Sequence, residues 1–187
     1  MKRKRNWVIG LVLATATAIT VLTTVSAPDA EPPVTQSSEI TEAPSSSQGN
    51  CGYQWAYHDA PELTQSFDGA VKALDSKASG RVEFYGEDCV YTDGTSTFSA
   101  METDFHVRLQ VEDLDKEEDF GNWVAQVMEI VIQIPREELS GNYGFVEFWF
   151  EKNETEHIVF RVPIQQYINE AQGRSGAELF KMYYEQP

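Results

Sequence analysis

The sequence predicts an α+β fold: an antiparallel sheet of about five strands with helices packed on one face, in the order α-βββ-α-ββ-α. Two observations predict it. Several stretches alternate apolar and polar residues, which is typical of strands with one buried face, and others repeat apolar residues at helical spacing. Neither pattern leads to a folded element before residue 51, so we place a single acidic domain at residues 51–187.

Residues 1–27 have the arrangement of an export signal. A basic cluster, Met1–Arg5, precedes the uncharged and largely apolar run Trp7–Ala27, and the positive flank of such a segment stays in the cytoplasm. The run is long enough to cross a hydrocarbon core of about 30 Å as an uncleaved signal-anchor. Small residues at Val25–Ala27 also suit a cleaved signal peptide of bacterial type. The domain is therefore expected outside the cytoplasm, either anchored in the cell membrane by a single transmembrane helix or secreted.

Residues 28–50 are rich in Pro, Ser, Thr and Glu. A segment with so few large apolar residues cannot bury enough surface to fold, so we expect a disordered linker that holds the domain away from the membrane.

The chain is strongly acidic, with 14 Lys and Arg against 30 Asp and Glu and a net charge of −16. This charge argues against nucleic acid and against anionic lipid as ligands, because both select basic surfaces. It is compatible with a cationic protein partner or divalent cations, and it also serves solubility alone.

Cys51 and Cys89 are the two cysteines of the chain. An even pair in an oxidising compartment predicts one disulfide. In the chain-entropy model a loop of this length contributes about 4 kcal/mol, and the bond would pin the incoming linker to the sheet. A reactive or metal-binding pair is the alternative, but no CxxC motif or histidine cluster accompanies the cysteines.

The first predicted helix begins near Asp59 and ends at Gly80. Asp59 would cap it, Pro61 lies in its first turn, and glycine is common just after a helix. Its apolar positions are Leu63, Phe67, Ala70, Val71, Leu74 and Ala78.

Three or four strands are predicted next. Residues 81–85 alternate, and residues 90–92 and 95–100 flank Asp93-Gly94, which favours a two-residue hairpin turn. The last of these strands places one set of side chains on the core face: Phe105, Val107, Leu109 and Val111.

A second helix is predicted to begin at Asp115, as its cap, and to stop near Pro135. Its end, Ile130–Ile132, could instead be strand. The helical stripe consists of Phe120, Trp123, Val124, Val127, Val131 and Ile134.

A final hairpin and two helices complete the domain. The core positions of the hairpin are all even-numbered, so that a loop of three or five residues is needed to pair core face with core face. They are Val146, Phe148, Phe150, Ile158, Phe160 and Val162. Ile164, Tyr167, Ile168 and Ala171 predict a helix closed by Gly173, and Leu179, Phe180 and Tyr183 a short terminal one. This order of elements resembles that of the type III secretion chaperone fold, and the resemblance implies a fold only.

The sequence assigns no catalytic, cofactor-binding or metal-binding residues. His58, His106 and His157 lie outside any zinc-ligand spacing, and no nucleophile or phosphate-binding motif occurs. His58 beside Asp59 is better explained as part of the helix start than as a catalytic pair. The acidic run 112–119 lacks the glycine of an EF-hand and is better explained as an acid-rich helix start.

Tyr53, Trp55 and Tyr57 alternate just after Cys51, so an extended segment would place them on one face. They form a candidate surface for a protein partner or a sugar, and their packing onto the domain is the structural alternative. We therefore predict a non-enzymatic interaction module with a protein partner. The alternatives are a secreted hydrolase with a carboxylate-based site and a structural envelope protein that self-assembles.

Overall fold

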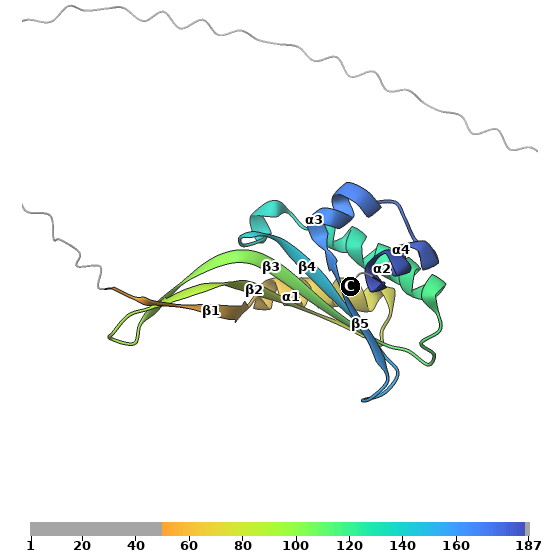
Figure 1. Cartoon of the computed structure of the whole chain (residues 1–187), viewed down its shortest axis with the longest axis horizontal. Coiled ribbons are helices and arrows are strands. Elements are labelled where there is room, and N and C mark those ends of the chain that lie inside the picture. Colours follow the sequence, from red (N-terminus) through yellow and green to blue (C-terminus); the bar gives the residue numbers. More distant parts are fainter. Residues whose placement is uncertain (1–49, 186–187) are drawn as a thin grey trace, which may run out of the picture. The chain divides into compact units, whose positions relative to one another are not determined.

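The computed structural model of the chain describes residues 50–185 (Figure 1). The chain divides into two units, Met1–Ser45 and Ser46–Pro187, and the described residues lie in the second. The predicted leader, residues 1–27, and nearly all of the predicted linker lie outside them. The elements are β1 (Gly52–Asp59), α1 (Pro61–Leu74), β2 (Ala78–Val90), β3 (Ser96–Gln110), α2 (Glu117–Ile132), η1 (Arg136–Glu138), β4 (Asn142–Glu151), β5 (His157–Pro163), α3 (Ile164–Gln166), η2 (Tyr167–Ala171) and α4 (Gly176–Tyr184).

The five strands form one mixed sheet in the order β1-β2-β3-β4-β5. Neighbouring strands are antiparallel except β3 and β4, which are parallel. The α+β class is therefore confirmed, whereas the prediction of a purely antiparallel sheet is wrong. The reason lies in the connection: the chain passes through α2 between β3 and β4, and such a helical crossover returns it to the end of the sheet from which β3 started.

The predicted order of strands is also wrong in its first half. Residues 81–85 and 90–92 were expected in separate strands, but one strand, β2, runs to Val90, and β3 likewise unites the two stretches that follow. A bulge between Tyr85 and Gly86 allows the ladder to continue through this irregular region. The sheet also contains a strand that the sequence did not predict, β1. It precedes α1, so the domain begins with a strand followed by a helix.

The β4–β5 hairpin confirms the loop length that was predicted from the even-numbered core positions. Val146 pairs with Val162, and Phe148 with Phe160, so core face meets core face. The last pair is Glu151 with His157, which leaves a loop of five residues, 152–156.

The β2–β3 connection contains the predicted Asp93-Gly94 turn in a longer form. Gly94 donates its N–H to Tyr91 O at 3.0 Å, and Tyr91 donates to Thr95 O at 2.9 Å. Gly94 has a φ of 85°, which glycine adopts without strain. The loop between the paired residues Val90 and Ser96 is therefore longer than the two-residue turn that we expected.

The helices occur where the apolar spacing predicts them, but their caps differ. α1 begins at Pro61 with Ala60 as N-cap, because Asp59 belongs to β1. It ends at Leu74, and Gly80 lies in β2 instead of closing the helix. α2 begins after Lys116, so Asp115 is not its cap.

The later helical predictions agree more closely with the structure. Ile130–Ile132 are helical, which resolves that alternative against strand. α3 and η2 together form the helix expected before Gly173, whose φ is 85°, and α4 is the expected terminal helix.

The hydrophobic core lies between one face of the sheet and the helices. From Gly144 to Phe150 of β4 the even-numbered residues are buried and the odd-numbered ones are half-buried, as expected for a sheet with one covered face. Within the described residues, no member of the buried hydrophobic core comes from 51–59 or 85–102. Figure 1 shows β1 and the outer ends of β2 and β3 extending beyond the helices. We refer to residues 51–58, 85–90 and 96–102 as the arm.

Candidate interaction surface

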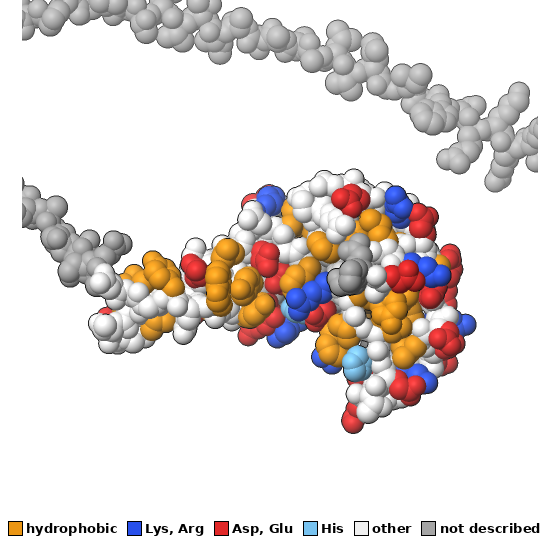
Figure 2. Space-filling model, viewed as in Figure 1, with side chains coloured by type: hydrophobic (Ala, Val, Ile, Leu, Met, Phe, Trp, Pro, Cys, Tyr) orange, Lys and Arg blue, Asp and Glu red, His pale blue; other side chains and the backbone are white. Residues whose placement is uncertain are grey.

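Three aromatic side chains project from one face of the arm. Tyr53, Trp55 and Tyr57 alternate along β1, and they keep 71%, 60% and 56% of their surface exposed. The sequence predicted that they share a face, and the alternation of side chains along a strand produces it. Their contacts with the rest of the described domain leave more than half of the surface of each residue exposed. Figure 2 shows apolar side chains along the arm, whereas over the rest of the visible domain apolar and charged side chains are interspersed.

A fourth aromatic residue, Tyr85 of β2, extends this surface. It pairs with Tyr57 in the β1–β2 ladder, and the ring centroids lie 4.8 Å apart. It also stacks on Trp55 at 5.5 Å, with an angle of 17° between the rings. Sequence reasoning missed Tyr85, although its position in the alternating stretch 81–85 placed it away from the core. We refer to Tyr53, Trp55, Tyr57 and Tyr85 as the aromatic row.

The opposite face of the arm holds β1 in place. His58 stacks on Phe98 of β3 at 3.9 Å, and its Nε2 lies 3.2 Å from Asp88 Oδ2. His58 therefore interacts across the sheet instead of contributing to a helix start with Asp59. These contacts orient β1 so that the aromatic row faces away from the helices.

The two cysteines form a disulfide in the structure. Cys51, just before β1, is bonded to Cys89 of β2, and their Cα atoms lie 5.3 Å apart, in the range that suits such a bond. Tyr53 is the ladder partner of Cys89. The bond thus ties the start of the arm to the sheet beside the aromatic row, as the sequence predicted.

A buried carboxyl group, Asp104, lies within electrostatic reach of the row. It is 0% exposed, its Oδ1 accepts a hydrogen bond from Phe145 N–H at 3.2 Å, and its Oδ2 has no partner among the described residues. Burial raises the pKa of Asp104 to about 6. Burial, followed by the Asp104 charge, also raises the pKa of Tyr57, so the phenol stays protonated at neutral pH. No sequence pattern indicated this residue.

Beyond the row, the same face of the sheet continues as a network of charged and aromatic side chains. Glu147 accepts hydrogen bonds from Trp149 Nε1 and Arg161 Nε, both at 2.8 Å, and lies 3.3 Å from His106 Nδ1. Burial opposes ionisation of Glu147, but these hydrogen bonds prevail and lower its pKa. Arg161 also lies 4.1 Å from the ring centre of Phe145. Since each charge has an opposite partner, this region is best explained as a structural ion-pair network.

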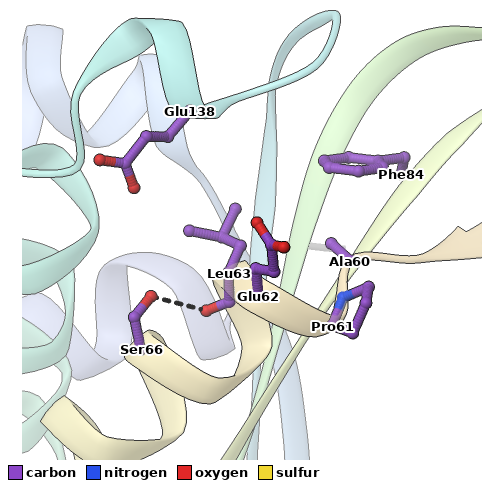
Figure 3. A pocket seen from close by; sticks show the side chains of 7 residues that line it. All are labelled: Ala60, Pro61, Glu62, Leu63, Ser66, Phe84 and Glu138. Atoms are coloured by element: carbon purple, nitrogen blue, oxygen red, sulfur yellow. Dashed lines mark hydrogen bonds between the residues drawn. The ribbon is translucent and has the colours of Figure 1, made fainter.

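A hollow of about 470 Å³ lies on the other face, where α1 begins (Figure 3). Figure 3 shows Leu63 and Glu62 between Phe84 on one side and Glu138 on the other. Ser66 Oγ donates to Leu63 O at 3.0 Å, so this hydroxyl is engaged within the helix. The hollow combines an apolar wall with two carboxyl groups, and Asp104 does not line it.

The remaining histidines do not form a metal site in the described residues. His106 Nε2 lies 3.2 Å from Glu83 Oε2, and His157 stacks on Trp149 at 5.2 Å. Across residues 50–185, no cluster of three or more His, Cys, Asp or Glu side chains has the geometry to hold a metal ion. The helices in that range are all too short or too polar to cross a membrane.

Comparisons with protein-family models, with curated proteins and with solved structures give no match to this chain.

Proposed function

We propose that this chain is a non-enzymatic interaction module that works outside the cytoplasm and binds a protein partner through the aromatic row. The observation that carries the proposal is the exposure of Tyr53, Trp55 and Tyr57 on a strand that adds nothing to the hydrophobic core. Contiguous exposed aromatic groups are typical of binding surfaces, and Trp and Tyr are enriched among residues that dominate binding energy. Each aromatic side chain can bury roughly 150–250 Å² in a contact.

The surroundings of the row indicate the chemistry of the partner. Glu87 is the ladder partner of Trp55, and Glu102 that of Tyr85, so carboxylates border the aromatic groups. The whole chain carries a net charge of −16. A partner with an apolar centre and basic residues around it would gain both from burial and from electrostatic steering.

The leader supports a place outside the cytoplasm. Residues 1–27 combine a basic flank with an apolar run, and the disulfide between Cys51 and Cys89 suits an oxidising compartment. In this proposal the module is tethered to the membrane through its linker, or released if the leader is cleaved.

The hydrolase alternative has weaker support. It needs a carboxyl group of raised pKa in a pocket that substrate can enter. Asp104 has a pKa of about 6, but its side chain is fully buried and lies outside the hollow at the start of α1. A general acid must reach the atom that it protonates, and a sealed carboxyl group does not.

The test is a comparison of full-length variants purified with their bound proteins after mild cross-linking. We expect the triple variant Tyr53→Ala/Trp55→Ala/Tyr57→Ala to lose the bound partner, because the burial contributed by the row is gone. Gln54→Ala on the other face of β1 should retain it, and so should Leu74→Ala, an exposed apolar residue on α1. Equal recovery of the same proteins by all variants, with unchanged circular dichroism, would contradict the proposal.

A further inference from the structure

We infer that a second copy of this chain is a partner of the aromatic row, joined through β1 so that the two β1 strands run antiparallel with Trp55 at the two-fold axis. This inference rests on the proposed function, since the same row makes the contact, and it adds a second copy of the chain to the basic protein partner that the bordering carboxylates favour. The two sheets would then become continuous across the dimer.

Among the described residues, β1 has a free edge that is able to accept a strand. It is the outermost strand of the sheet, and its ladder with β2 runs without a shift from Gly52–Val90 to Asp59–Glu83. Ala60, the next residue, donates its N–H to Val82 O at 3.2 Å. In an antiparallel ladder the N–H and C=O of one residue point to the same side, and the side alternates from residue to residue. The backbone N–H and C=O groups of the even-numbered residues of β1 therefore point toward β2, and those of the odd-numbered residues point toward the free edge.

Three of the odd-numbered residues of β1 belong to the row, and their order is symmetric. Tyr53, Trp55 and Tyr57 read the same in both directions about Trp55. Antiparallel pairing centred there places Trp55 opposite Trp55 of the second copy, and Tyr53 opposite Tyr57. Each of these pairs can exchange two backbone hydrogen bonds at a Cα separation of about 5.5 Å. The side chains of opposite residues lie on one face, so the two rows would join into a single aromatic surface.

The edge also lacks the features that keep strands apart. Gly52–Asp59 contains no lysine, no proline and no bulge, which are the usual protections of an exposed edge. Asp59 is the one carboxylate of β1, and in the proposed register it lies opposite Cys51 instead of another acid. Because the arm extends beyond the helices (Figure 1), the two acidic bodies would lie at opposite ends of the paired strands.

The area of the contact predicts a weak dimer. Three aromatic side chains at roughly 150 Å² each set an upper limit of ~450 Å² per copy, because rows that join edge to edge bury only the sides that meet. A typical stable complex buries about 800 Å² per partner. Residues 1–50 precede the arm in the sequence and include the proposed membrane anchor. Anchoring confines the copies to one surface and raises their effective concentration, so a weak contact becomes populated there.

The test uses charge pairs in the full chain, with sedimentation measured in detergent over a series of concentrations. Because residue 55 faces itself, Trp55→Lys and Trp55→Glu should each weaken self-association by at least about tenfold through like-charge repulsion. An equal mixture of the two variants should recover it. In one chain, Tyr53→Lys/Tyr57→Glu should self-associate and Tyr53→Lys/Tyr57→Lys should not, while Leu74→Lys serves as the control away from the arm.

Recovery in the Trp55 mixture would establish the register. A wild-type chain that stays monomeric at every concentration, and gives no covalent dimer on cross-linking in membranes, would overturn the inference. A dimer that the Trp55 variants do not weaken would also overturn it, and so would a mixture of the two variants that does not recover self-association. Such a result, with retained binding of a different protein at the row, would overturn the inference and leave the proposed function in place. If neither a second copy of the chain nor any other protein binds at the row, both the inference and the proposed function are contradicted.

Discussion

Asp104 is the residue in which burial and charge conflict most clearly. Its carboxyl group is fully buried, accepts one backbone hydrogen bond, and has a pKa of about 6 against an ordinary value of 3.8. A raised pKa means that the folded state favours the protonated form. The contribution of Asp104 to stability is therefore complete below pH 4 and is lost as the pH rises through about 6.

Asp104→Asn is expected to stabilise the domain at neutral pH. The amide resembles the neutral acid and can still accept the hydrogen bond from Phe145 N–H, but it carries no charge. The increase in the free energy of unfolding should reach at most about 3 kcal/mol at pH 7.5 and vanish near pH 4. Urea unfolding of both proteins across this pH range measures it, and a variant that is less stable at pH 7.5 would refute the assignment.

Asp68→Asn should behave in the opposite way and serves as the control. Hydrogen bonds from Lys72 and then from Gly80 N–H lower the pKa of Asp68. A lowered pKa stabilises the fold above the ordinary pKa, and this contribution is lost as the pH falls. The variant should thus be less stable than the wild type at pH 7.5, with the difference shrinking in acid.

Two glycines in helices distinguish packing from helix propensity. Gly121 of α2 is buried, and a Cβ there would collide with the backbone of Gly176 at the start of α4. Gly69 of α1 has nothing within 4 Å of the position that a Cβ would occupy. The close approach of α2 and α4 therefore requires glycine at position 121, whereas position 69 of α1 can accommodate a side chain.

Gly121→Ala should destabilise the domain by about 1–3 kcal/mol through overpacking, and Gly69→Ala should stabilise it by roughly 0.5–1 kcal/mol through helix propensity. Denaturant midpoints of the two variants measure these effects. Equal shifts of the same sign would show that the contact between α2 and α4 is not as close as described.

The disulfide is expected to act mainly on the arm. In Cys51→Ala/Cys89→Ala the start of β1 loses its bond to β2, and no core residue is altered. Amide hydrogen exchange should become faster in residues 52–58 and stay slow in β4, because local opening of the arm leaves the core intact. Unchanged exchange in β1 would mean that the stacking of His58 on Phe98 suffices to hold the arm.

The sequence predicts those elements whose signals are local. The β4–β5 hairpin follows from parity alone, and the helical stripes of α1 and α2 follow from spacing. The parallel pairing of β3 with β4 could not be predicted, because it depends on where a crossover returns. β1 was missed as a strand because its aromatic residues resemble a terminal segment until the β2 ladder is known. Tyr85 and Asp104 acquire their roles only from neighbours that are distant in sequence.

For the chain as a whole, the proposed place outside the cytoplasm is supported by the predicted leader and by the Cys51–Cys89 disulfide. The expressed full-length chain should fractionate with membranes, or appear outside the cell if the leader is cleaved. In both cases its non-reduced mass should be lower than that of the reduced chain by two hydrogen atoms, because the Cys51–Cys89 bond has formed. A fully reduced chain in the cytoplasmic fraction would contradict this placement.

The binding role of the aromatic row can be tested most directly by photo-cross-linking in intact cells. A photoreactive phenylalanine derivative would replace Trp55 in the full chain, with Gln54 on the other face of β1 and Leu74 on α1 as control positions. The proposal predicts discrete covalent protein adducts from position 55, including the dimer of the chain, and few from the two controls. Adducts from position 55 that are no more frequent than those from position 74 would contradict it.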